Sequence, residues 1–256
     1  STSRGLGDVY KRQLKYRMPN GHPEVPLEDV EQALRIMMGL EAGATGFTAD
    51  KVGIVGSSAG GHLAASASTL ARTKPAFSIL FYPVITAEKG KAHQGSFNAL
   101  LGDKRNAETD TWYSLQNRVS SETPPTLLLL SDDDKVVPPV NGILYYNALK
   151  EHGVKASMHI YPTGGHGWGI RDRFKYKEQW QQATLDWLKE LNDDRNTASV
   201  LLRQPGLPGC VDVGIRPATS RKSAGRELAE AVVQAAVQEF GQQVRSRRES
   251  DWPAGQ

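Results

Sequence analysis

The chain alternates between short apolar runs and longer segments in which apolar residues recur every three or four positions. Short alternating or continuous apolar runs are typical of strands, and the wider spacing is typical of amphipathic helices. Strands are therefore expected at residues 51–55, 77–82, 126–130 and 156–161, with the end of another strand at 14–18. Because helical segments separate these runs, the pattern predicts an α/β fold with a mostly parallel sheet covered by helices on both faces.

The expected helices follow the same rhythm along the chain. One begins at Pro26, one spans residues 59–70, and one spans residues 140–152 before Gly153, a residue common just past helix ends. A last helix presents Tyr176, Trp180, Ala183, Trp187 and Leu191 at helical spacing. Two short helices are expected near residues 97–101 and 109–115, inside a polar stretch at residues 86–123.

Both ends of the chain differ from its middle. Residues 3–13 match a translated sequencing adapter, so residues 1–13 are interpreted as an artefact and the natural protein is expected to begin upstream. The regular pattern defines one domain over residues 14–192. Residues 193–256 form a tail without βα rhythm, and an amphipathic helix could span residues 223–244. That tail is interpreted as disordered, as an artefactual join, or as a small partner-binding helix.

Composition and charge exclude several classes of protein. The net charge is +3, but residues 14–192 contain equal numbers of basic and acidic side chains, so the excess lies at the two ends. No clustered basic face indicates a nucleic-acid partner. No apolar run approaches the roughly 20 residues that span a bilayer, so no membrane partner is expected. The one cysteine, Cys210, allows neither a disulfide framework nor a cysteine metal site within one chain.

The segment at residues 56–60 reads Gly-Ser-Ser-Ala-Gly and fits the pattern G-x-S-x-G. It lies between an expected strand and an expected helix, where a tight turn would expose the Ser58 hydroxyl above the sheet. The same turn would aim the Ala59 N–H at a developing oxyanion, and small neighbours suit so sharp a turn. A phosphate-binding loop is the alternative, but His62 stands where such a loop needs lysine.

A serine nucleophile needs a base, and His166 is the candidate. It lies in the glycine-rich run at residues 164–169, just after an expected strand, and the alternative is a plain glycine-rich turn. The other histidines show no metal-ligand spacing, so no metal site is predicted; they are His22, His62, His93, His152 and His159.

The third member of such a site should be a carboxylate between the serine and the histidine. Residues 132–134 are three consecutive aspartates directly after the strongly apolar run at 126–130. Asp134 is the preferred residue and Asp133 the second choice, because a carboxylate at a strand end can orient the imidazole. The alternative interpretation is a solvated acidic turn.

Four segments together carry a family resemblance, at residues 16–30, 50–64, 132–141 and 161–169. They resemble the α/β-hydrolase superfamily and, more closely, bacterial acetylxylan esterases and feruloyl-esterase-like enzymes. The resemblance implies a three-layer αβα sandwich, a Ser-His-Asp triad, and acetyl or other short acyl esters on xylan-type sugars as substrates. It also implies no metal and no organic cofactor. The N-terminal strands of that fold, with the loop supplying a second oxyanion donor, are expected to precede this chain.

Alternatives to the esterase interpretation stay open at this point. A prolyl-oligopeptidase-like peptidase shares the fold and the triad order. A truncated hydrolase without activity, a binding scaffold on the same fold, and an artefactual reading frame are the others. Ser57, Trp112 and Trp168 are candidate substrate contacts, although packing explains the two tryptophans equally well. The expected partner is a small-molecule or polysaccharide ester, and the sequence specifies neither the oligomeric state nor the compartment.

Overall fold

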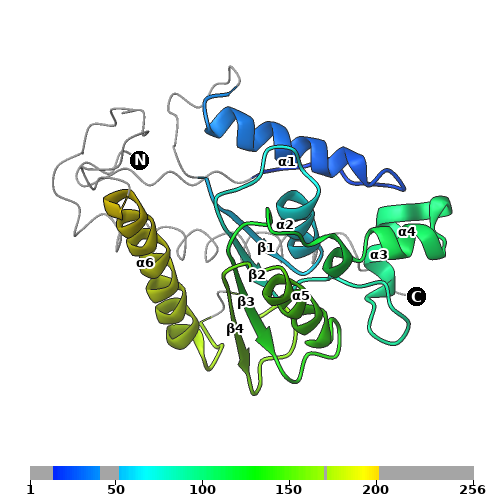
Figure 1. The fold of residues 1–256 in the computed structure, drawn as a ribbon. Coiled ribbons are helices and arrows are strands. Elements are labelled where there is room, and N and C mark those ends of the chain that lie inside the picture. The colour runs from blue at the N-terminus through cyan, green and yellow to red at the C-terminus, as the bar shows by residue number, and fades with distance from the viewer. Residues whose placement is uncertain (1–13, 41–51, 170–171, 202–256) are drawn as a thin grey trace. The chain divides into compact units, whose positions relative to one another are not determined.

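A computed structural model of the chain describes residues 14–40, 52–169 and 172–201 (Figure 1). The chain divides into two compact units, residues 13–176 and a second unit made of residues 1–12 with 177–256. The adapter-like residues 1–13 and the possible helix at 223–244 lie outside the described residues.

The sheet of the 13–176 unit has four parallel strands in the order β1-β2-β3-β4. They are β1 (Ile54–Ser57), β2 (Ser78–Phe81), β3 (Thr126–Ser131) and β4 (Ala156–Tyr161). Residue 57 of β1 pairs with residue 81 of β2, which in turn pairs with residue 129 of β3. Because all strands run the same way, the loops that leave their carboxyl ends gather at one edge of the sheet.

Helices follow the strands in the predicted alternation, and several bounds agree closely with expectation. They are α1 (Glu24–Met37), α2 (Ala59–Thr69), α3 (Gln94–Leu101), α4 (Ala107–Trp112), α5 (Val140–Glu151) and α6 (Lys177–Leu201), with 3-10 turns η1 (Gly102–Lys104) and η2 (Leu115–Arg118). The α/β class and the parallel sheet are confirmed. The helical layer on a second face stays a prediction, because α6 belongs to the other compact unit.

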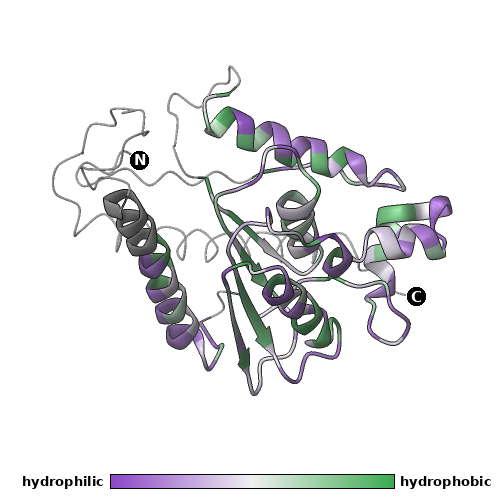
Figure 2. Cartoon of the chain, viewed as in Figure 1, coloured by the Kyte–Doolittle hydropathy of each residue, from purple (hydrophilic) through white to green (hydrophobic). Residues whose placement is uncertain are grey.

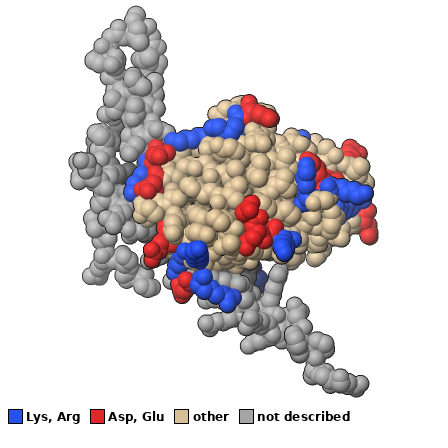
Figure 3. Space-filling model, turned by 90° about the horizontal axis from the view of Figure 1, so that it is seen from below, with Lys and Arg blue, Asp and Glu red and all other residues tan. Residues whose placement is uncertain are grey.

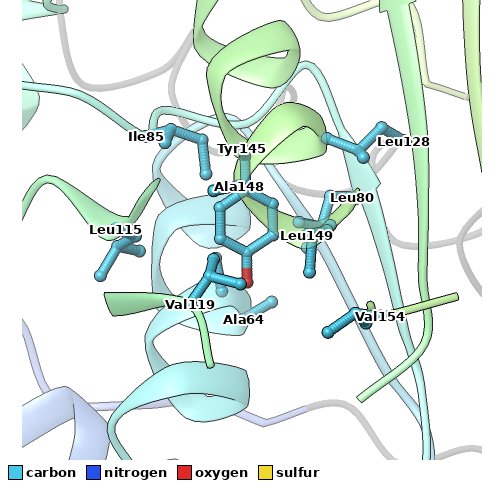
Figure 4. Packing of buried hydrophobic residues seen from close by; sticks show 11 residues of the cluster. Ala64, Leu80, Ile85, Leu115, Val119, Leu128, Tyr145, Ala148, Leu149 and Val154 are labelled. Atoms are coloured by element: carbon cyan, nitrogen blue, oxygen red, sulfur yellow. The ribbon is translucent and has the colours of Figure 1, made fainter. Parts of the chain in front are cut away.

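The core of the 13–176 unit forms where α2 and α5 pack against β2 and β3. Ala64 of α2, Leu80 of β2, Leu128 of β3 and Tyr145 of α5 belong to one buried cluster (Figure 4). Figure 2 shows the strands mostly in green, whereas α1 carries purple and green faces. Strand β3 is buried along its whole length, as its unbroken apolar sequence predicts. This packing anchors the strand ends from which the candidate site is built.

One predicted strand is wrong. Residues 14–18 form no strand in the structure, although their side chains alternate between apolar and charged. The Arg17 backbone N–H donates to Asp29 Oδ2 at 2.7 Å instead of to a neighbouring strand. The Arg17 guanidinium also donates to Asp29 Oδ1 from Nε at 2.9 Å and from Nη2 at 2.7 Å, and its Nε lies 3.1 Å from Oδ2. Alternation alone cannot separate a strand from an extended segment whose backbone is satisfied by a helix side chain.

Two predicted boundaries also move. Strand β1 spans residues 54–57 instead of the predicted 51–55, and it ends later because pairing with β2 continues through Gly56 and Ser57 up to the turn. Helix α6 continues past the boundary expected after residue 192 and ends at Leu201. The remainder of the predicted tail lies outside the described residues.

Candidate active site

Ser58 forms the sharp turn between β1 and α2, with φ 54° and ψ −123°. A non-glycine residue rarely adopts positive φ, and such strain costs about 1–3 kcal/mol. The Ser58 N–H donates to the Phe81 carbonyl at 3.0 Å, while its own carbonyl accepts from the N–H groups of His62 and Val84 at 3.2 and 3.0 Å. These backbone bonds hold the strained turn in place and present the side chain.

Small residues around the turn are required at two positions and not at a third. A Cβ on Gly56 would lie 2.3 Å from the Gly60 carbonyl oxygen, and one on Gly61 would lie 2.8 Å from Pro83 Cβ. At Gly60 itself a Cβ would meet nothing within 4 Å. Close packing therefore explains Gly56 and Gly61, whereas no neighbour requires glycine at position 60.

Ser58, His166 and Asp134 lie in one hydrogen-bonded line. Ser58 Oγ is 2.8 Å from His166 Nε2, and His166 Nδ1 is 2.7 Å from Asp134 Oδ2. The second Asp134 oxygen accepts the N–H groups of Val136 and Val137, each at 2.9 Å. An ionised carboxylate only accepts, so Nδ1 donates to Asp134 and Nε2 is left to accept the serine hydroxyl.

Burial favours the same arrangement. The Asp134 side chain is 1% exposed and the His166 side chain 17% exposed. In such a low-dielectric position a hydrogen bond between these groups is stronger than in water. His166 can therefore take the hydroxyl proton from Ser58, and Asp134 can stabilise the imidazolium that results.

The adjacent aspartate contacts the histidine segment differently. Asp133 Oδ1 accepts the N–H of Gly165 at 2.7 Å, and its side chain is exposed. This backbone hydrogen bond is the main cause that lowers the pKa of Asp133. Of the two candidates left open by the sequence, Asp134 is the one that contacts the imidazole. We call residues 132–138 the acid loop and residues 162–169 the histidine loop.

Tyr82 is a residue of this site that sequence reasoning missed. It follows β2, is buried, and has φ 35°, an unusual value for a bulky residue. Its ring centroid lies 4.7 Å from that of His166, with an interplanar angle of 60°. The signal that could have found it is its place between an apolar strand and Pro83, directly beside the Ser58 turn in the parallel sheet.

The predicted substrate contacts fall in different environments. Trp168 is 3% exposed and stacks on Phe174 with centroids 4.0 Å apart, so packing is the better interpretation and sugar stacking is not supported. Trp112 on α4 is 49% exposed, and the Arg118 guanidinium lies 3.8 Å from its ring centre. Ser57 ends β1 and is partly buried.

Ala59 is exposed and is the first residue of α2. The first N–H groups of a helix have no acceptor within it, and the helix dipole places partial positive charge there. An N–H at this position can therefore accept negative charge that develops on a carbonyl oxygen beside Ser58.

His62 lies one turn after Ser58 but serves a different purpose. It is buried, and its Nε2 lies 2.9 Å from the Tyr113 carbonyl, so Nε2 carries a proton. Burial lowers its pKa to about 4, which keeps the ring neutral. Within the described residues, no group of three or more His, Cys, Asp or Glu side chains is placed to hold a metal ion.

The described surface carries mixed charge. On the face seen in Figure 3, Lys and Arg side chains are interspersed with Asp and Glu side chains, and most of the surface is neither. Among the helices of the described segments, none has the length and apolar character needed to cross a membrane.

Comparison with known proteins places this geometry in a family. The profile of the prolyl oligopeptidase family matches residues 5–194. An acetylxylan esterase of Xylanibacter ruminicola is 41% identical over 184 residues, covering 70% of this chain and 38% of that protein. Endo-1,4-beta-xylanase B of Butyrivibrio fibrisolvens is 32% identical over 157 residues, covering 56% of this chain and 24% of that protein. The chain thus spans less than half the length of the curated relatives it matches.

A solved structure gives the same assignment. An acetyl ester-xyloside bifunctional hydrolase from Caldicellulosiruptor lactoaceticus has a TM-score of 0.62 and 34% identity, covering 70% of each chain. Its match adds a fold-level likeness to the sequence likeness, and the parallel sheet with its strand-turn-helix at Ser58 agrees with both. The chain therefore belongs to the prolyl oligopeptidase family and has the α/β-hydrolase fold.

Proposed function

We propose that the chain is a serine esterase that hydrolyses acetyl or other short acyl esters on xylan-type carbohydrates. The observation that carries the proposal is the hydrogen-bonded line from Ser58 through His166 to Asp134, with links of 2.8 and 2.7 Å. The substrate class is supported by the 41% identity to an acetylxylan esterase. No cofactor is part of the proposal.

The first half of the reaction forms an acyl-enzyme. Ser58 Oγ attacks the ester carbonyl carbon while His166 Nε2 takes the hydroxyl proton, and Asp134 stabilises the resulting imidazolium. The carbonyl oxygen gains negative charge and accepts the Ala59 N–H. The bond to the sugar oxygen then breaks, and His166 returns its proton to that oxygen, which leaves as an alcohol.

The second half repeats these steps with water. His166 takes a proton from a water molecule, which attacks the acyl carbon and forms a second tetrahedral oxyanion at the Ala59 N–H. The bond to Ser58 Oγ breaks, the proton passes back to the serine, and a carboxylic acid is released. The same base thus serves both half-reactions, so its distance to Ser58 governs both.

The direct test removes the nucleophile. Ser58→Ala should lower the turnover of p-nitrophenyl acetate by about 10⁴-fold or more, because triad members act as a unit. Circular dichroism of the variant checks that the fold is retained. Turnover near the parental rate in a folded variant would end the proposal.

A serine peptidase is the second candidate, and the family name favours it. The same three side chains can cleave an amide by the same sequence of steps. Acetate release from acetylated xylan, measured beside cleavage of a proline-containing peptide, separates the two. We expect acetate release to dominate; peptide cleavage without acetate release would favour the peptidase.

A further inference from the structure

Two adjacent carboxylates of the acid loop contact the histidine loop at different places. Asp134 accepts from the ring of His166 at 2.7 Å, and Asp133 accepts from the backbone N–H of Gly165, also at 2.7 Å. Asp134 is buried and Asp133 is exposed. One carboxylate orients the imidazole, and the other holds the backbone that carries it.

The histidine loop needs contacts that fix its backbone, because it is rich in glycine. Gly164, Gly165, Gly167 and Gly169 have φ values of 149°, 60°, 73° and 40°, a region that other residues rarely adopt. Glycine loses more backbone conformational freedom on folding than any other residue, so the local sequence does little to hold this loop in one conformation. The position of His166 must therefore be set by contacts from outside the loop.

Contacts of this kind lie on both sides of His166. Downstream, Trp168 stacks on Phe174 at 4.0 Å and packs against Tyr82 at 5.2 Å. Upstream, Gly165, the residue directly before His166, is held by Asp133. The aromatic contact is buried in the core, whereas the carboxylate contact is exposed and can be removed without opening a cavity.

We propose that Asp133 is a positioning residue for the base: by accepting the Gly165 N–H it keeps His166 Nε2 within reach of Ser58 Oγ. The inference rests on the proposed function of Ser58 and His166. A displacement of about 1 Å in a reacting group can cost on the order of 100-fold in rate, so a single backbone hydrogen bond one residue from the base is enough to matter.

The charge of Asp133 suits this task. The hydrogen bond from Gly165 lowers the pKa of Asp133, and one from Gly164 lowers it further, so the carboxylate stays ionised at neutral pH. Hydrogen bonds to an ionised acceptor are shorter and stronger than those between neutral groups. The 2.7 Å distance to the Gly165 nitrogen agrees with that description.

The test compares three variants of exposed aspartates. Asp133→Ala should lower kcat for p-nitrophenyl acetate about 10- to 100-fold with KM within about twofold, because the base moves while substrate contacts stay. Asp133→Asn should stay within about threefold of the parent, since its amide oxygen can accept the same N–H. Asp132→Ala removes the same charge from the neighbouring exposed residue and should leave kcat within about twofold.

The rate of Ser58 labelling by a fluorophosphonate is measured on the same proteins, and it requires no assumption about the substrate. A slower labelling rate in Asp133→Ala alone, with parental rates in the other two, supports the positioning role even if acetyl esters prove to be poor substrates. Parental kcat and labelling in Asp133→Ala would overturn the inference. Equal losses in Asp132→Ala would also overturn it, because the cause would then be loss of charge from the loop and not of the hydrogen bond to Gly165. Equal losses in Asp133→Asn would overturn it as well, because an acceptor for the Gly165 N–H would then not be enough to position His166.

Discussion

The Ser58 turn and the histidine loop bring two ends of one hydrogen bond together by different physical means. The turn is built within one strand-helix unit, with its backbone bonded to β2 and to the segment after β2. The histidine loop is rich in glycines at positive φ and is held by side chains from other parts of the unit, namely Asp133, Asp134 and Tyr82. Close packing and backbone hydrogen bonds fix the Ser58 turn, whereas a set of separate side-chain contacts fixes the histidine loop.

This difference predicts how each region fails when it is altered. A change in the turn should damage folding, because strained backbone and close contacts leave no room to relax. A change in the contacts of the histidine loop should damage catalysis first and leave the fold intact. Substitutions in the two regions test this distinction, because they separate a loss of activity from a loss of stability.

Asp134→Asn tests the loop side of the comparison. The amide preserves the shape of the side chain but favours the wrong imidazole tautomer, so kcat for p-nitrophenyl acetate should fall by about 10⁴-fold. Steady-state kinetics measures the loss, and thermal unfolding serves as the control. A fall of less than about tenfold would mean that Asp134 does not act through the His166 ring.

Gly56→Ala tests the turn side. Its Cβ would lie 2.3 Å from the Gly60 carbonyl oxygen, so the backbone must shift, and we expect the free energy of unfolding to fall by about 3 kcal/mol. Gly60→Ala is the matched control, because a Cβ there meets nothing within 4 Å. Urea unfolding of both variants gives the comparison, and equal stabilities would contradict it.

His62, which lies on α2 after Ser58, should make the free energy of unfolding depend on pH. Burial lowers its pKa to about 4 from an ordinary 6.5, so between these values the unfolded chain binds more protons than the folded one. Stability should therefore decrease as the pH falls through this window, by about 2 kcal/mol between pH 7 and pH 5. Urea unfolding at both pH values measures the change.

The control for this effect is His62→Gln, which keeps a donor for the Tyr113 carbonyl but does not titrate. In that variant the contribution of this position to the pH dependence should disappear. An unchanged loss of stability between pH 7 and pH 5 would assign the effect to other groups.

Substitutions of Tyr82 should change kcat least, and they separate the contribution of its ring from that of its hydroxyl. Its ring lies 4.7 Å from the His166 ring, so Tyr82→Leu should remove the aromatic support and lower kcat by roughly tenfold. Tyr82→Phe keeps the ring and should stay within about threefold. If Phe and Leu variants lose activity equally, the ring contact is not what positions the base.

The same comparison explains which parts of the molecule could be predicted from the sequence. The Ser58 turn depends on neighbouring residues, so G-x-S-x-G between a strand and a helix predicted its form directly. The sequence could not show which aspartate of the run at residues 132–134 contacts the histidine, because the three residues are chemically identical. Only the folded loop places Asp134 against the His166 ring and Asp133 against the Gly165 N–H.

Contacts between different segments of the chain account for the remaining differences between the sequence-based predictions and the structure. Tyr82 lies 84 residues before His166 and Phe174 lies 8 residues after it, and the periodicity of the sequence does not predict that their rings pack against the histidine loop. For the same reason, the sequence favours neither packing nor sugar stacking for Trp168. The alternation at residues 14–18 predicted a strand, but the partner of its backbone is a helix carboxylate, which periodicity does not detect.

Mass mapping after fluorophosphonate treatment tests whether His166 and Asp134 make Ser58 a nucleophile. We predict one adduct on the peptide that contains Ser58, and a labelling rate at least about 10³-fold lower in His166→Ala. An adduct on another residue, no adduct at all, or an undiminished rate without the imidazole would contradict the account.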